Sequence, residues 1–356
     1  MPKTRVLVVD DAVIARKMLS DMLASDPDIE VVGTAPNGKI ALQKIPHLNP
    51  DIVTLDVEMP VLGGLETLKE IRKDYPNLPV IMCSAFTKKA AEITINALSF
   101  GASDYVCKPS GLDGGKGKDA VGKELVSKIR SLCGQGSPSA RVSAGSPIKQ
   151  ALAMLTPFSV RAVVIGVSTG GPNALAEVIP RLSKTFPAPI LVVQHMPPMF
   201  TQCLAERLDE KSQLSVVEAQ AGMEIVPGVV YIAPGDFHME VSKGCPETVK
   251  IQKGPYENSC RPAVDVLFRS VPPVYGGDVI AVILTGMGKD GCNGCRWIKE
   301  AGGYVIAQDE ATSVVWGMPG YVVQEGLADA VLPLCEIATE LERLANQRAI
   351  VREDRY

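Results

Sequence analysis

Short apolar runs alternate with helix-like spacing through the first third of the chain. The runs read as buried strands, and they span residues 5–11, 30–33, 51–56, 78–84 and 102–109. After the first run, apolar residues recur at helical intervals at Ile14, Met18 and Met22. Because strands that alternate with helices form parallel sheets, this pattern predicts a five-stranded, doubly wound α/β domain over residues 1–133.

The same alternation resumes after a break in composition. A helix with apolar positions from Val121 to Leu132 closes the first domain, and residues 134–157 then have the composition of a flexible Gly- and Ser-rich linker. Further apolar runs span residues 162–165, 190–195, 215–218, 228–234, 279–285 and 304–308. They predict a second doubly wound, mostly parallel α/β domain over residues 158–356, with an antiparallel hairpin within residues 228–241.

Composition excludes some classes of protein but does not identify a single one. The chain of 356 residues is 46% hydrophobic with a net charge of −4, which allows two cores and gives no strong field for nucleic acid or membrane. With no apolar run of 18 residues and no signal peptide, we expect a soluble, cytoplasmic protein. The nine cysteines form no disulfide framework. Cys292-x-x-Cys295 lacks a second pair for zinc, so packing is its simplest role.

Polar side chains stand at the ends of strands predicted in the first domain: Asp10, Asp11, Asp56, Ser84 and Lys108. The carboxyl ends of parallel strands meet at one edge, so these groups converge. Carboxylates that converge repel one another unless a cation neutralises them, and Mg²⁺ is the common cellular choice. A lysine and a hydroxyl in the same crevice suit a phosphoryl group. Singly, the paired acids could cap a helix and Lys108 could be a solvated charge, but the ordered set favours a phosphate and metal site.

This set resembles that of a two-component response-regulator receiver domain, which has a flavodoxin-like fold. The matching motifs are Val8-Val-Asp10-Asp11, Leu55-Asp56-Val-Glu58-Met-Pro60, Gly63-Gly64, Ser84-Ala85 and Tyr105-Val-Cys-Lys108-Pro109. The resemblance implies that Asp56 accepts a phosphoryl group from a histidine kinase.

The resemblance also implies roles for the residues around the phosphoacceptor. Mg²⁺ would be bound by Asp10, Asp11, Asp56 and the backbone carbonyl of Glu58. Ser84 and Lys108 would contact the phosphate, and Tyr105 would be the aromatic side chain that rotates on phosphorylation.

The second domain has its most distinctive turn directly after its first strand. There, Gly166-x-Ser168-x-Gly170 precedes Pro172, which suits the first turn of a helix. Ser168 is therefore expected at the carboxyl edge of the sheet, beside free N–H groups that can receive an oxyanion. The pattern fits the nucleophile elbow of hydrolases, while a dinucleotide-binding loop and a purely structural turn are alternatives. A dinucleotide loop would want an acid at the end of the next strand, where His195 stands instead.

Three strand ends of the second domain carry Ser168, His195 and Asp290. A hydroxyl nucleophile needs a base, and the base needs a carboxylate to fix its tautomer, so this set predicts a Ser-His-Asp hydrolase. The chain has only two other histidines. His47 lies in the first domain, and His238 follows a tight turn where a structural role is the simpler interpretation.

The second domain resembles the catalytic domain of the chemotaxis protein-glutamate methylesterase family, CheB. The matching stretches are Gly166-Val-Ser-Thr-Gly-Gly-Pro-Asn-Ala-Leu175, Gln194-His-Met-Pro197, Tyr231-Ile-Ala-Pro-Gly235, Val264-Asp-Val-Leu-Phe268 and Leu284-Thr-Gly-Met-Gly-Lys-Asp-Gly291. The resemblance implies a catalytic triad of Ser168, His195 and Asp290. It places the oxyanion site at the backbone N–H of Met287, beside Thr169 and Gly170. One departure is that Cys260-Arg-Pro-Ala263 stands where the family usually has a His and a Pro-Ser pair.

The two resemblances together imply a phosphorylation-activated enzyme. It would hydrolyse methyl esters on glutamate side chains of chemotaxis receptors, release methanol, and deamidate receptor glutamines, with no cofactor for the esterase reaction. We expect the unphosphorylated receiver to inhibit by covering the active site. The expected partners are methyl-accepting receptors and a chemotaxis histidine kinase, with no nucleic acid, no membrane insertion and a monomeric state. The alternative is a phosphorylation-controlled binding or regulatory module with a degenerate esterase fold.

Overall fold

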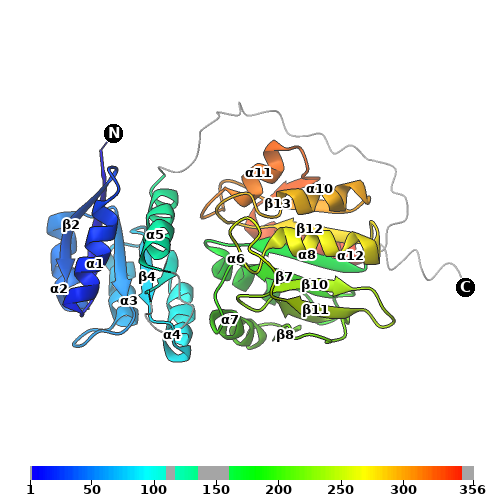
Figure 1. Cartoon of the computed structure of the whole chain (residues 1–356), viewed down its shortest axis with the longest axis horizontal. Coiled ribbons are helices and arrows are strands. Elements are labelled where there is room, and N and C mark those ends of the chain that lie inside the picture. Colours follow the sequence, from blue (N-terminus) through cyan, green and yellow to red (C-terminus); the bar gives the residue numbers. More distant parts are fainter. Residues whose placement is uncertain (1, 110–116, 135–159, 347–356) are drawn as a thin grey trace, which may run out of the picture. The chain divides into compact units, whose positions relative to one another are not determined.

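Two parallel sheets organise the chain, one in each of the units Met1–Gly136 and Ser137–Tyr356 (Figure 1). The computed structural model describes residues 2–109, 117–134 and 160–346. The predicted linker over residues 134–157 lies outside the described residues except for Gly134. Among the helices that are described, none is long and apolar enough to cross a membrane.

The first unit contains all five predicted strands, in the parallel order β2-β1-β3-β4-β5. The strands are β1 (Thr4–Val9), β2 (Ile29–Ala35), β3 (Ile52–Asp56), β4 (Val80–Ser84) and β5 (Asp104–Cys107). The helices are α1 (Val13–Ala24), α2 (Gly38–Leu48), α3 (Gly64–Asp74), α4 (Lys88–Ser99) and α5 (Lys118–Leu132). β3 and β4 are buried along their whole length, as expected for parallel strands that are covered on both faces.

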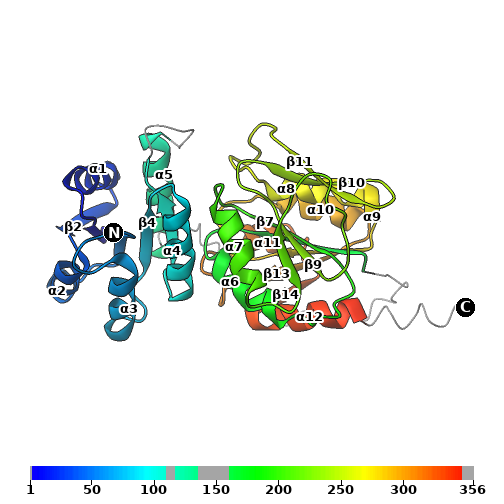
Figure 2. The same cartoon turned by 90° about the horizontal axis from the view of Figure 1, so that it is seen from below.

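The helices of the first unit cover both faces of its sheet. α1 and α5 lie on one face, where Leu19 and Leu125 belong to the same core cluster as Val6 and Val8 of β1 (Figure 2). α2 and α3 pack together on the other face, and α3 also contacts α4. Every strand therefore ends at the same edge of the sheet, between two helical layers.

The second unit is built on a seven-stranded sheet in the order β14-β13-β12-β6-β7-β9-β8, and all of its strand pairs are parallel. The strands are β6 (Ala162–Val167), β7 (Ile190–Gln194), β8 (Ser215–Glu218), β9 (Val229–Ile232), β12 (Val279–Ile283), β13 (Tyr304–Gln308) and β14 (Ala330–Leu332). The helices are α6 (Gly171–Val178), the 3₁₀ turn η1 (Ile179–Arg181), α7 (Phe200–Asp209), α8 (Val264–Ser270), α9 (Pro272–Tyr275), α10 (Cys292–Glu300), α11 (Met318–Gln324) and α12 (Leu334–Asn346).

Helices cover both faces of this sheet as well. Leu267 of α8, Ile298 of α10 and Val322 of α11 share one core cluster with Val164 of β6. α6 and α12 pack together on the opposite face (Figure 2). Cys292 and Cys295 are both buried and both belong to the core cluster of α8, α10 and α11, so the packing role predicted for the Cys-x-x-Cys pair is confirmed.

The antiparallel hairpin is present but lies one strand later than the sequence pattern predicted. β9 joins the large parallel sheet, and β10 (His238–Ser242) pairs instead with β11 (Thr248–Gln252). The prediction of a hairpin within residues 228–241 was therefore wrong in its pairing. β9 is buried among β7 and β8, whereas Asp236 has a left-handed φ of 64° and turns the chain away from the sheet before β10 begins.

Candidate active site and phosphorylation site

Ser168 is the first residue after β6, and its backbone is fixed on both sides. Its N–H donates to the carbonyl of Thr285 at 3.0 Å, two residues after the end of β12. Its carbonyl accepts from the N–H of Gly171 at 2.8 Å and from Nε2 of Gln194 at 2.9 Å. The left-handed φ of 77° at Gly170 then turns the chain into α6. These contacts hold the half-buried Ser168 at the centre of the carboxyl edge of the sheet.

His195 stands at the neighbouring strand end and is oriented by Asp290. The last residues of β6 and β7 pair in register, and the N–H of His195 donates to the carbonyl of Val167 at 3.2 Å. Nε2 of His195 lies 2.8 Å from Oδ2 of Asp290. Because the carboxylate is an acceptor, Nε2 carries a hydrogen, and in the neutral ring Nδ1 then keeps the lone pair. The structure therefore brings His195 and Asp290 together as the sequence predicted.

Asp290 is only 2% exposed and is held by donors on both oxygens. Oδ2 accepts from the N–H of Val264 at 2.7 Å, and Oδ1 accepts from the N–H of Asp265 at 3.1 Å and from Nδ2 of Asn258 at 2.8 Å. Burial raises the pKa of Asp290, but the hydrogen bonds from His195 and the backbone outweigh it and hold the pKa below its ordinary value. Asp290 is therefore a fixed anion beside the imidazole.

Cys260 is the other neighbour of the imidazole. Its Sγ lies 3.6 Å from Nδ1 of His195. Burial lowers the pKa of His195, but Cys260 and Asp290 favour the protonated ring and together raise the pKa above its ordinary value. Among the described residues, the Ser168 hydroxyl has no hydrogen-bond partner in this state. Hydrogen bonds of this kind commonly tighten only when substrate binds.

The turn that follows β12 passes directly against Ser168. A methyl group placed on Gly286 would lie 2.8 Å from Cβ of Ser168. Met287 is the next residue of this turn and is half-buried. Thr169 is 4% exposed, and its carbonyl accepts from Oγ1 of Thr285 at 3.0 Å. The structure thus brings the predicted oxyanion residues into the two turns that flank Ser168.

The remaining histidines have no part in this arrangement. His238 is 1% exposed, its Nε2 donates to the carbonyl of Pro255 at 2.8 Å, and its Nδ1 accepts from the N–H of Ala263 at 3.2 Å. Both ring nitrogens are therefore occupied by backbone groups, which confirms the structural role predicted for His238. His47 is exposed near the end of α2.

The first unit gathers its predicted polar groups around Lys108. The Nζ of Lys108 lies 2.6 Å from Oδ2 of Asp10 and 2.8 Å from Oδ2 of Asp56. Oxygens of Asp10, Asp11 and Asp56 all lie within 4.8 Å of one another. Burial raises the pKa of Asp56, Lys108 opposes this, and the other two carboxylates add to the rise.

These carboxylates fit a hard divalent cation. Mg²⁺ prefers oxygen ligands, and three convergent carboxylates offer them. Glu58 is exposed, and its carboxylate pairs with Nζ of Lys89 at 2.8 Å, so that side chain points away from the cluster. The sequence resemblance assigned the backbone carbonyl of Glu58, and not its side chain, to the metal.

Ser84 at the end of β4 and Tyr105 of β5 are both buried. The Oγ of Ser84 accepts from Oγ1 of Thr94 at 2.9 Å, and the backbone carbonyl of Ser84 accepts from the N–H of Lys108 at 2.8 Å. Tyr105 is 5% exposed, and Nζ of Lys128 lies 4.9 Å from its ring centre. The ring is therefore in an inward position in this structure.

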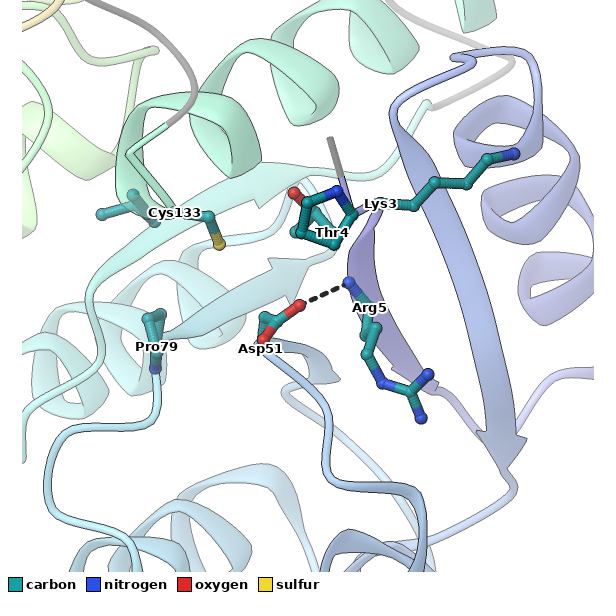
Figure 3. A pocket seen from close by; sticks show the side chains of 8 residues that line it. Lys3, Thr4, Arg5, Asp51, Pro79 and Cys133 are labelled. Atoms are coloured by element: carbon teal, nitrogen blue, oxygen red, sulfur yellow. Dashed lines mark hydrogen bonds between the residues drawn. The ribbon is translucent and has the colours of Figure 1, made fainter.

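A separate hollow lies at the opposite, amino edge of the same sheet (Figure 3). Here the backbone N–H of Arg5 donates to Oδ2 of Asp51 at 2.8 Å, beside Pro79 and Cys133. Burial, with a smaller effect of Asp51, raises the pKa of Cys133 to about 11, so this thiol stays protonated at physiological pH. The hollow contains none of the predicted site residues.

Comparisons with known proteins cover both units. The family described as CheB methylesterase matches residues 163–341, and the family described as response regulator receiver domain matches residues 6–115. A protein-glutamate methylesterase/protein-glutamine glutaminase of Trichodesmium erythraeum is 48% identical over 350 residues, covering 96% of this chain and 99% of the relative. The chain belongs to the CheB methylesterase family.

Solved structures agree with this assignment for the second unit. The CheB methylesterase catalytic domain of Thermotoga maritima is 52% identical and superimposes with a TM-score of 0.51, covering 52% of this chain and 100% of that one. A curated relative from the same organism, a protein-glutamate methylesterase/protein-glutamine glutaminase, is 47% identical over 342 residues and covers 96% of this chain and 98% of its own length. The receiver and esterase folds predicted from the sequence are therefore confirmed.

No role was predicted for Asn258 or Asp265, although both support Asp290. Asn258 bonds to both Asp290 and Asp265, each at 2.8 Å, and Asp265 also accepts from the N–H of Gly294 at 2.6 Å, in α10. Burial, then the charge of Asp290, raises the pKa of Asp265. Gln194 belongs to the matching stretch Gln194-His-Met-Pro197, but no role was predicted for it either. The sequence did carry a signal for Asp265. It is the only charged residue in the apolar stretch Val264-Asp-Val-Leu-Phe268, and a carboxylate is rarely buried in such a stretch unless it is paired.

Proposed function

We propose that this chain is a phosphorylation-controlled methylesterase of glutamate side chains, and a glutaminase, acting on chemotaxis receptors. The observation that carries the proposal is the His195–Asp290 pair of 2.8 Å at the strand end next to Ser168. The names of the full-length relatives support the same reaction. The alternative of a binding module with a degenerate esterase fold gains no support, because the described residues supply nucleophile, base and orienting carboxylate.

The proton path follows from the tautomer of His195. Since Nε2 donates to Asp290, Nδ1 is the nitrogen that can accept the hydroxyl proton of Ser168. As Oγ attacks the ester carbonyl, the O–H proton passes to Nδ1, and the new C–O bond gives a tetrahedral oxyanion. The oxyanion collapses, the bond to the methoxy oxygen breaks, and the proton on Nδ1 leaves with methanol. Water then repeats the sequence on the acyl-enzyme, and with glutamine the leaving group is ammonia.

The oxyanion would be stabilised by backbone N–H groups of the two turns that flank Ser168. We assign this role to the N–H of Met287, with Thr169 and Gly170 shaping the other wall. Donors that the backbone already orients cost little reorganisation during the reaction, which makes such sites effective. Gln194 would serve as a positioning residue, because its amide bonds the carbonyl of Ser168 at 2.9 Å.

Control would come from the first unit. Asp56 would accept the phosphoryl group from a histidine kinase. Lys108, 2.8 Å from Asp56, would pair with the added charge. The hydroxyl of Ser84 would release Thr94 and donate a hydrogen bond to the phosphoryl group. Asp10, Asp11 and Asp56 would hold Mg²⁺, which neutralises charge on the phosphoryl group when it is bound. Tyr105 would rotate as the switch. We place the protein in the cytoplasm, as a monomer.

The direct test is methanol release from membranes that carry methylated receptors. Ser168→Ala and His195→Ala should each abolish turnover, and Asp290→Asn should leave a small residual rate. Because triad members act as a unit, the losses should not add in the double variant. His47→Ala, which changes an exposed histidine on α2, is the matched control and should behave as the unmodified protein. If His238→Ala were inactive in folded form while His195→Ala kept its rate, the assignment of the base would be wrong.

A further inference from the structure

Cys260 is held against the catalytic imidazole by a tightly built loop. The backbone groups of Glu257 and Cys260 bond one another in both directions, at 2.8 and 3.1 Å. Asn258 and Ser259 between them have left-handed φ values of 51° and 63°, a conformation that asparagine tolerates but that is uncommon for serine. The side chain of Asn258 also bonds Asp290. The loop that positions Cys260 is thus fastened to the same carboxylate that orients His195.

The sulfur and the imidazole nitrogen are spaced as two ligands of one zinc ion. Zinc bonds nitrogen at about 2.0 Å and sulfur at about 2.3 Å, so tetrahedral geometry separates the two ligand atoms by about 3.5 Å. The observed separation of Sγ of Cys260 and Nδ1 of His195 is 3.6 Å. Among the residues that the structure describes, His195, Cys260 and Asp290 form one of two clusters of potential metal ligands, and the other is the carboxylate cluster of the first unit.

Asp290 completes the outer part of such a site. Histidines that bind metal commonly donate their second ring N–H to a carboxylate, and Nε2 of His195 does so to Asp290 at 2.8 Å. Both oxygens of Asp290 already accept hydrogen bonds, from Val264 and His195 on one and Asn258 on the other. Asp290 would therefore orient the ligand and remain outside the coordination sphere.

We propose that Nδ1 of His195 and Sγ of Cys260 bind Zn²⁺, and that bound zinc reversibly inhibits the esterase. A thiol and an imidazole are ligands that suit zinc, and Mg²⁺ prefers oxygen. Binding releases the thiol proton to solvent and occupies the lone pair that would take the proton of Ser168. With two protein ligands and the other positions left to water, the site is open, and it binds less tightly than a closed four-ligand site.

Binding is tested with Co²⁺, because a bond between thiolate and cobalt gives a charge-transfer absorption in the near ultraviolet. The full chain should develop this band on titration with Co²⁺, and Zn²⁺ should displace it. Cys260→Ser should lose the band, whereas Cys245→Ser and Cys335→Ser, which change the two exposed cysteines, should keep it. A band of unchanged intensity in folded Cys260→Ser, or no band in the unmodified chain, would overturn the proposed site.

Inhibition is tested by methanol release at buffered concentrations of free Zn²⁺, and this part rests on the proposed function. Each variant is compared with its own zinc-free rate. The inhibition constant of Cys260→Ser should exceed that of the unmodified chain by about tenfold or more, since even outer-shell changes cost about 10–100-fold in metal affinity. Cys335→Ser leaves both clusters of potential metal ligands intact, so its inhibition constant should match that of the unmodified chain.

Equal zinc sensitivity of Cys260→Ser and the unmodified chain would refute inhibition through this site. The two experiments also separate the two proposals. A protein that shows no methanol release but gives a Cys260-dependent cobalt band would contradict the proposed function and still support the metal site.

Discussion

His195 lies between two groups that favour its positive charge. Asp290 bonds Nε2 at 2.8 Å, and Cys260 faces Nδ1 at 3.6 Å. Burial disfavours the charged ring, but these two neighbours outweigh it and raise the pKa. A general base works only while it is neutral, so the raised pKa moves the working range of this residue toward alkaline pH.

The pH dependence of the reaction should report this effect. With a chelator present to exclude metals, kcat/KM for methanol release should rise with pH along a limb above the ordinary imidazole pKa of about 6.5. Cys260→Ser removes one group that raises the pKa of His195, so its limb should move to lower pH. Cys335→Ser, an exposed thiol on α12, should leave the limb in place. A limb that moves to higher pH in Cys260→Ser, or does not move, would contradict this account.

At the scale of elements, the sites are made by strand ends that a sequence can predict. The apolar runs fix β6, β7 and β12, and parallel pairing brings their last residues to one edge. The pairing of the hairpin was predicted wrongly. The run of four apolar residues in β9 and the alternating pattern of β10 were read as one hairpin, but β9 joins the parallel sheet. The loop at Asn258 escaped prediction for another reason. Its left-handed residues and its bond to Asp290, 32 positions away, leave no periodic signal.

The turns at these strand ends leave no room for added atoms. A methyl group on Gly286 would lie 2.4 Å from Sδ of Met318 and 2.8 Å from Cβ of Ser168. Gly286→Ala should therefore displace the nucleophile and lower kcat by about 100-fold, the effect of a misplacement of about 1 Å. Gly117→Ala adds its methyl group where nothing lies within 4 Å and should not change kcat. The rates of the two variants are compared at saturating substrate. A Gly286→Ala protein with full kcat would show that the turn accommodates the methyl group without displacing Ser168.

At the scale of the whole molecule, each unit has its own core. Phe268 and Val164 belong to the cluster of the second unit, and Leu19 and Val6 to that of the first. A solved catalytic domain of a relative is covered completely by the second unit alone. The two units are therefore suited to fold separately. The effect of the first unit on the esterase can then be measured by removing the first unit.

We expect the unphosphorylated receiver to inhibit the esterase. A fragment of residues 150–356 should release methanol several-fold faster than the unphosphorylated full chain, because the tethered receiver acts at high effective concentration. Treatment with acetyl phosphate and Mg²⁺ should raise the rate of the full chain toward that of the fragment, and Asp56→Asn should abolish both the labelling and the increase. A fragment no faster than the full chain would mean that phosphorylation activates by another route.

The three histidines of the chain occupy three separate environments. His47 is exposed on the receiver, both ring nitrogens of His238 bond backbone groups, and His195 lies between Asp290 and Cys260. Imidazole resonances in an NMR spectrum of the intact protein would therefore divide without selective labelling into one surface reporter, one packing reporter and one active-site reporter. Phosphorylation, substrate and metal could then be followed in a single sample, each through the resonance of the region that it reaches.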